Sequence, residues 1–133
     1  MIYTRSIRLA DTDAAGVIYF ANLLSICHEA YEESLARSGI FLRDFLDDSP
    51  IAIPIAKAEI QFFHPLFCGD RLRVQIHPIS IADTEFELEY TIFLGENTEK
   101  AVGKARTRHV CIDRYSRQRI VLPNPLQNWL KSL

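Results

Sequence analysis

The sequence predicts an α+β fold in which an antiparallel five-stranded sheet wraps round one long central helix. The helix is predicted because residues 19–38 repeat their apolar side chains at helical spacing. The sheet is predicted because runs between residues 51 and 113 alternate apolar and polar side chains, as half-buried strands do. A length of 133 residues with 48% hydrophobic and 24% charged content suits one core. We therefore expect a single domain over residues 1–133.

The first half of the chain should form a strand, the long helix and a short helical turn. The strand is expected over Ile2–Leu9, and the turn over residues 41–48, just before Pro50. Gly39 follows the last periodic residue of the long helix, which is typical of a glycine that ends a helix. The predicted buried stripe of that helix consists of Leu23, Ile26 or Cys27, Ala30, Tyr31, Ser34 and Leu35.

The second half should form four strands in an antiparallel meander and a short C-terminal helix. The strands are expected over residues 51–63, 71–79, 85–94 and 100–113, each with one apolar face. Pro54 indicates a sheet edge or a break near the start of the first of them. Asn124 is the expected N-cap of the last helix, with Pro125 at its first position. So narrow a sheet leaves an edge strand or its outer face free to pair with a second subunit.

Composition limits the classes of function. A formal net charge of −2 argues against nucleic-acid binding, and no apolar run approaches the roughly 20 residues of a membrane helix. The N-terminus is polar within four residues, so we expect no secretory signal and a cytoplasmic protein. Three separated cysteines, Cys27, Cys68 and Cys111, suit buried reduced thiols better than disulfides or a metal site.

The stretch LADTDAAGVIYF, residues 9–20, carries the chemistry. Asp11 and Asp13 stand just before the helix, where a carboxylate can simply cap backbone N–H groups, and this is the open alternative for Asp11. After Asp13 the small residues AAGV allow a ligand to approach closely, and VIYF supplies an apolar wall. Asp13 could therefore act as nucleophile or general base while helix N–H groups polarise a carbonyl oxygen.

These segments resemble the 4-hydroxybenzoyl-CoA thioesterase family of the hotdog-fold superfamily, which carries an Asp-x-Asp-x-x-Gly-x-Val-Tyr motif at this place. The resemblance extends through FFHPLFCGDRLRV, residues 62–74, and covers nearly the whole chain. It implies a hotdog fold and hydrolysis of an aromatic acyl-CoA without metal or cofactor. It also implies a homo-oligomer, a dimer or a dimer of dimers (homotetramer), with the site at a dimer interface. More narrowly, LADTDAAGVIYF, CHEAYE, CGDRL and HVCID are similar to the cyanobacterial and plant 1,4-dihydroxy-2-naphthoyl-CoA thioesterases of phylloquinone (vitamin K1) biosynthesis.

The resemblance also implies roles for individual residues. Asp13 matches the catalytic aspartate, and the backbone N–H of Phe20 matches the group that polarises the thioester oxygen. Gly16 and Val17 would shape the approach of the pantetheine arm, and Asp11 would hold the loop. On the helix, Leu24 and His28 would face the acyl group, although His28 could equally bond to solvent or to Glu32.

A basic strip, residues 100–119, holds seven of the fifteen Lys and Arg residues and one acidic residue, Asp113. Lys104, Arg106 and Arg108 share one strand face by parity, and the resemblance makes them candidates to bind the phosphates of coenzyme A. A solvated strand face explains them equally well.

Three alternatives remain open from the sequence. The chain could act on 4-hydroxybenzoyl-CoA or on another acyl-CoA or acyl-ACP, or it could bind acyl-CoA without catalysis. It could also be a dehydratase of the same fold, which needs a histidine acting with an acid. In that case His28 or His64 should lie within hydrogen-bond reach of Asp13.

Overall fold

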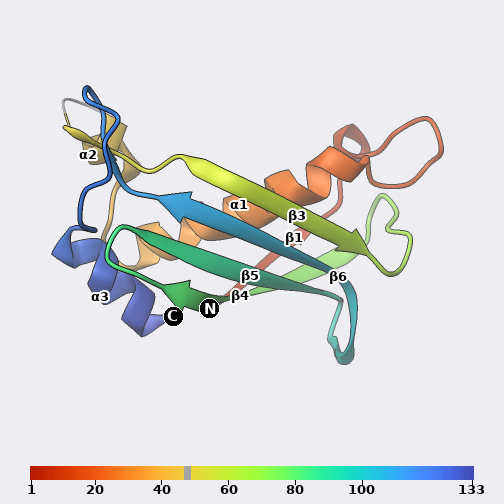
Figure 1. Ribbon diagram of the computed structural model, residues 1–133. Helices are drawn as coiled ribbons and strands as arrows, with labels where there is room; N and C mark the ends of the chain where they lie inside the picture. The colour runs from red at the N-terminus through yellow and green to blue at the C-terminus, as the bar shows by residue number, and fades with distance from the viewer. Residues whose placement is uncertain (47–48) are drawn as a thin grey trace.

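The computed structural model describes residues 1–46 and 49–133 and shows a mixed α+β fold (Figure 1). The main sheet has the strand order β1-β4-β5-β6-β3, and every neighbouring pair is antiparallel. Strands β2 and β7 pair with each other in a separate two-stranded sheet. The elements are β1 (Ile2–Ser6), α1 (Phe20–Arg37), α2 (Leu42–Leu46), β2 (Ile51–Ala52), β3 (Ile55–Phe62), β4 (Arg71–Ile81), β5 (Glu85–Leu94), β6 (Asn97–Val110), β7 (Ile112–Asp113) and α3 (Asn124–Ser132).

The predicted four-strand meander is wrong in one respect. Strands β4, β5 and β6 do follow one another, but β3 pairs with β6 and not with β4, so that Glu59 stands opposite Arg106. The chain therefore crosses from one side of the sheet to the other between Phe62 and Arg71. Alternation of apolar and polar residues shows which face of a strand is buried, but it carries no information about which strand lies beside it.

Two predicted strands are shorter than expected because the chain bends. β1 ends at Ser6, and Leu9–Asp11 form a 3₁₀ turn in which Asp11 N–H donates to Arg8 O over 2.9 Å. The strand expected over residues 51–63 is interrupted at Pro54, which has no N–H to donate, so the first part pairs with β7 instead. Of the predicted turn over residues 41–48, α2 covers Leu42–Leu46, and residues 47–48 lie outside the described residues.

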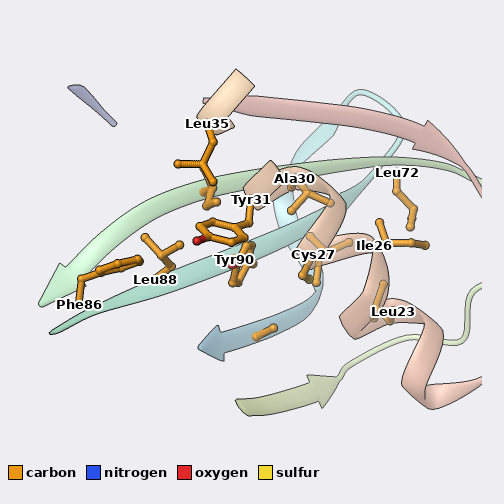
Figure 2. Packing of buried hydrophobic residues seen from close by; sticks show 14 of the residues in the cluster. Leu23, Ile26, Cys27, Ala30, Tyr31, Leu35, Leu72, Phe86, Leu88 and Tyr90 are labelled. Atoms are coloured by element: carbon orange, nitrogen blue, oxygen red, sulfur yellow. The ribbon is translucent and has the colours of Figure 1, made fainter. Parts of the chain in front are cut away.

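Helix α1 packs its predicted apolar stripe against the sheet. Tyr19 and Ser38 flank the helix, and Gly39 has a positive φ of 78°, which glycine adopts without a steric penalty. Figure 2 shows α1 side chains facing those of Leu88 and Tyr90 on β5. Each such fully buried apolar side chain contributes about 1.5–3 kcal/mol relative to leaving it exposed. The predicted stripe is buried, and the structure buries both Ile26 and Cys27, which the prediction gave as alternatives. The buried residues of the helix are Leu23, Ile26, Cys27, Ala30, Tyr31, Ser34 and Leu35.

The C-terminal helix α3 begins one residue earlier than predicted and is capped differently. Pro123 occupies the N-cap position, Asn124 is the first helical residue, and the helix start has no side-chain cap bond. The prediction that Asn124 caps the helix is therefore wrong, because the fixed, extended geometry of Pro123 already turns the chain into the helix. Trp129 anchors α3 to the core: its ring meets Phe86 edge-on at 5.5 Å, and Nε1 donates to Ser34 Oγ over 3.2 Å.

The three thiols do not share one environment. Cys27 and Cys111 are buried, as predicted, and burial raises the pKa of Cys27 to about 12. Cys68 is exposed, so the prediction that all three are buried is wrong. It lies in a turn whose next residue, Gly69, has a φ of 92°, and turns of this kind run over the surface.

One imidazole lies inside the apolar core. His109 is 0% exposed and stacks on Phe86 at 4.7 Å, with the two ring planes 7° apart. Its Nε2 lies 2.8 Å from Thr107 Oγ1, which in turn lies 3.2 Å from the hydroxyl of Tyr90. Within the described residues, Nδ1 has no hydrogen-bond partner. Burial, with a smaller contribution from the charge of nearby His28, lowers the pKa of His109 to about 4.

Strand β3 is an exposed sheet edge. Every residue of it except Ile60 is exposed, including Ile55 and Phe62. Backbone groups on such an edge are available to pair with another chain.

Across residues 1–46 and 49–133, no helix combines the length and apolarity needed to cross a bilayer.

Candidate active site

The loop that carries Asp11 and Asp13 is closed by backbone hydrogen bonds. Asp13 N–H donates to Val17 O over 2.9 Å, and Tyr19 N–H donates to Asp11 O over the same distance. Gly16 makes the reversal at a φ of 82° and donates its N–H to Asp13 O over 3.0 Å. The loop is tied to the rest of the molecule where Ile18 N–H donates to Leu66 O. It is therefore a fixed turn that presents its side chains at the start of α1.

The loop orients the carboxylate of Asp13 but leaves most of its acceptor positions available. Its Oδ1 accepts the N–H of Ala15 over 2.8 Å, and in the described part of the chain this is its only hydrogen bond. The side chain is exposed. A carboxylate has about four acceptor positions, so Asp13 keeps most of its capacity to attack a carbon or accept a proton.

The start of α1 supplies the complementary donors. Phe20 is the first residue of the helix, and the first four N–H groups of a helix have no intrahelical acceptor. The helix dipole adds a partial positive charge at the same end. A carbonyl oxygen placed here would be stabilised as it becomes negative, which is the requirement for breaking a thioester.

Asp13 and Phe20 open onto one pocket of about 450 Å³. One wall comes from the loop and the start of α1, and the other comes from the end of β3 and the residues that follow it. The aromatic rings are open to solvent: Phe20 is 60% exposed and Phe63 is 51% exposed. The pocket is thus mainly apolar with one carboxylate, which suits an aromatic ligand. Its lining is Asp13, Val17, Ile18, Tyr19, Phe20, Phe62, Phe63, His64, Pro65 and Leu66.

The structure brings together some of the predicted site residues and separates others. Asp13, Val17 and Phe20 line this pocket, whereas Gly16 sits at the loop reversal outside the lining. Leu24, which was expected to face the acyl group, is half-buried against the core and does not line this pocket. His28 does not reach Asp13's pocket, so within one chain the structure does not support its expected contact with the acyl group there.

His28 lines a second pocket of about 400 Å³ near the other end of α1. Its Nδ1 lies 3.4 Å from a carboxylate oxygen of Glu32, one helical turn further on, which is the alternative that the sequence left open. Tyr31, Pro54 and Arg117 line the same pocket.

The segment 62–66 is the part of the site that the sequence reasoning missed. The sequence feature that could have revealed it is the pair of adjacent aromatic residues Phe62 and Phe63, which breaks the alternation of β3. Adjacent large apolar side chains at the surface often mark a binding site. His64 also faces this pocket, and its Nδ1 lies 2.6 Å from Pro65 O. Between the described residues there is no hydrogen bond from His64 or His28 to Asp13, so the acid–histidine pair of a dehydratase is not formed in the single chain.

Lys104, Arg106 and Arg108 lie on the outer face of the sheet, where acidic residues oppose them. Arg106 Nε donates to Glu89 over 3.0 Å, and Lys104 Nζ lies 3.9 Å from the same carboxylate. Burial works against the ionised form of Glu89, yet the Arg106 hydrogen bond and the charge of Lys104 lower its pKa below the ordinary value. Lys104 is opposite Gln61, one residue before the pocket's Phe62. This face therefore carries opposite charges on neighbouring strands, and the strip's Lys104 is at the end nearer to Phe62 along β3.

Known proteins share this architecture. The sequence matches the model of the Thioesterase-like superfamily over residues 7–130. It is 59% identical to a 1,4-dihydroxy-2-naphthoyl-CoA hydrolase of Microcystis aeruginosa, covering 98% of this chain and 92% of that one. It is 55% identical to the hydrolase of the same name from Rippkaea orientalis, covering 98% and 94%. The crystal structure of a 1,4-dihydroxy-2-naphthoyl-CoA thioesterase from Synechocystis superposes with a TM-score of 0.93 at 38% identity, covering 99% and 96%.

These matches, together with the five-stranded antiparallel sheet, identify the chain as a hotdog-fold thioester hydrolase. The chain belongs to the Thioesterase-like superfamily. Among the described residues, no group of three or more His, Cys, Asp or Glu side chains is arranged to hold a metal ion.

Proposed function

We propose that this protein hydrolyses 1,4-dihydroxy-2-naphthoyl-CoA to 1,4-dihydroxy-2-naphthoate and coenzyme A, as a step of phylloquinone biosynthesis. The observation that carries the proposal is the meeting of the Asp13 carboxylate and the free N-terminus of α1 in one aromatic pocket. The names and high identity of the relatives support the acyl group.

In this mechanism the thioester carbonyl oxygen accepts the N–H of Phe20. Asp13 then attacks the carbonyl carbon or takes a proton from a water that attacks it. In either case the C–S bond breaks and coenzyme A leaves as a thiolate that takes up a proton. When water attacks, the acid forms directly. When Asp13 attacks, water then hydrolyses the anhydride between Asp13 and the acyl group, which releases the acid and restores the carboxylate. Tyr19, Phe62 and Phe63 would exclude water from around the acyl ring of the substrate. The lower local dielectric would strengthen the interaction between the N-terminus of α1 and the carbonyl oxygen.

The proposed enzyme is a homodimer, or a dimer of dimers, joined through the exposed edge of β3. Two β3 strands that pair antiparallel about their middle would place the end of one, at Phe62, beside the start of the other, at Ile55. Ile55 follows Pro54 of the His28 pocket, so the His28 pocket of one subunit would adjoin the Asp13 pocket of the other. In that assembly His28 regains its expected place near a hydroxyl of the acyl ring.

The test is kcat/KM of the purified protein across 1,4-dihydroxy-2-naphthoyl-CoA, 4-hydroxybenzoyl-CoA, benzoyl-CoA and a long-chain aliphatic acyl-CoA. We expect the naphthoyl ester to be the best substrate by at least tenfold, a difference of about 1.4 kcal/mol in transition-state binding. Preference for the aliphatic chain would contradict the acyl group proposed. Tight binding of the naphthoyl ester without hydrolysis would instead indicate a binding protein.

We further propose that Lys104, Arg106 and Arg108 of the basic strip bind the nucleotide end of coenzyme A. Replacing both Arg106 and Arg108 by Gln should raise KM for the CoA ester about tenfold with kcat nearly unchanged, because the lost contacts stabilise the bound substrate and the transition state equally. The N-acetylcysteamine thioester of the same acid lacks the phosphates, and its KM should not change. Arg119→Gln is the matched control, since Arg119 pairs with Glu85 at the far end of the strip. Equal KM for the double variant and the native protein would refute this role.

A further inference from the structure

Arg5, on β1, links the loop of the candidate site to helix α1. Its Nη1 donates to Glu29 Oε1 on the helix over 2.7 Å, and its Nη2 donates to the carboxylate of Asp11 in the loop. The side chain is only 17% exposed. Such charge-assisted bonds from one planar guanidinium fix direction as well as distance.

Further hydrogen bonds hold the carboxylates of Asp11 and Glu29 in place around the Arg5 guanidinium. Asp11 Oδ2 also accepts the backbone N–H of Arg8 over 2.8 Å, and Glu29 Oε2 accepts the hydroxyl of Tyr3 over 2.8 Å. Burial works against the charge of Arg5, but Glu29 and Asp11 together raise its pKa above the ordinary value. Burial and the bond to Glu29 raise the pKa of Tyr3 to about 12, so it remains a neutral donor.

Asp11 transmits this restraint to the reacting groups. Its carbonyl oxygen accepts the N–H of Tyr19 over 2.9 Å and the side-chain amide of Asn22 over 3.0 Å. Tyr19 directly precedes Phe20, whose N–H is the proposed donor to the substrate. Asp13 follows Asp11 by two residues. Asp11, which Arg5 binds, is therefore linked to both reacting groups: to Asp13 through the chain, and to Phe20 through the hydrogen bond of its neighbour Tyr19.

We propose that Arg5 is a positioning residue for thioester hydrolysis. By bridging Asp11 and Glu29 it sets the Asp13 loop at the right separation from the N-terminus of α1. The inference rests on the proposed function, and it concerns geometry because Arg5 does not line the Asp13 pocket. A displacement of about 1 Å between reacting groups can cost a factor of about 100 in rate.

The experiment compares Arg5→Gln, Arg5→Lys, Asp11→Asn and the Arg5→Gln/Asp11→Asn double variant on an aryl-CoA. Arg5→Gln should lower kcat about 10- to 100-fold with KM within about twofold, because substrate contacts remain. The double variant should be no worse than the poorer single variant, since both changes break the same link. Arg5→Lys should recover part of kcat. Arg37→Gln is the control: it removes an exposed ion pair with Glu33 and a hydrogen bond from α1 to Ile2 O of β1. Since neither bond involves the Asp13 loop, kcat should be unchanged.

Hydrogen exchange keeps the inference separate from the proposed function. In Arg5→Gln the amides of Asp13 and Tyr19, which bond within the loop, should exchange at least tenfold faster than in the native protein, while β5 amides keep their rates. Unchanged exchange at these amides overturns the inference whatever the activity. So does a kcat of Arg5→Gln equal to that of the native protein. If the native protein hydrolyses no aryl-CoA but the loop amides are released, the proposed function fails and the structural link stands.

Discussion

Replacing Asp13 by Asn is expected to lower kcat for aryl-CoA hydrolysis by about a thousandfold, with KM within a few fold. The amide keeps the shape of the side chain and can still accept the N–H of Ala15. It can neither attack the carbonyl nor accept a proton from water, and loss of such a group costs factors of this size. Single-turnover rates on the naphthoyl ester measure the loss directly.

Asp44→Asn is the matched control, because it removes the same charge from an exposed position on α2. Its kcat should equal that of the native protein. If Asp13→Asn turns over substrate at the native rate, the assigned role of Asp13 is refuted and another group must activate the water.

Acid is expected to destabilise the fold through His109. The folded-state pKa is about 4 and the ordinary value is 6.5, so between these two values the unfolded chain binds a proton that the folded chain does not. The unfolding free energy should therefore fall by about 2–3 kcal/mol as the pH drops from 7 to 4.5. Protonation would put a proton on Nδ1, which has no acceptor within the described residues. Urea unfolding at both pH values measures the difference.

His109→Phe should reduce this loss of stability by about 2 kcal/mol, since phenylalanine carries no titrating group. Phe86→Leu is the control, because it disturbs the same ring stack but keeps the imidazole. It should lower the unfolding free energy at both pH values and retain the pH dependence. A His109→Phe variant with the full native pH dependence would show that other groups cause the acid sensitivity.

The fold was predictable wherever a periodic pattern decided it. The periodicity of α1 predicted the stripe that the helix buries, leaving open only the choice between Ile26 and Cys27, which are both buried. Pro54 marked both a break and an edge strand. The position of β3 beside β6 was not predictable, because a strand's own residues do not record its neighbour. The same limit applies to Cys68, whose apolar neighbours in sequence gave no sign that it lies in an exposed turn.

The candidate site was predictable where its residues are close in sequence. Asp13, Val17 and Phe20 lie within eight positions, and the loop folds them onto one pocket. The wall at Phe62 and Phe63 is more than forty residues away and arrives only through the sheet. His28 was placed by counting helical turns, which fixes its face on α1 but not which pocket that face meets.

The exposed thiol of Cys68 affects how turnover has to be followed. It follows Phe67, whose backbone bridges to Val17 of the pocket. A disulfide reagent that reports released coenzyme A would also label this side chain. The label would then give a background signal and place a bulky adduct one residue from the backbone that pairs with Val17 of the pocket. Loss of the thioester's own ultraviolet absorbance, or a Cys68→Ser background, separates hydrolysis from labelling of the protein.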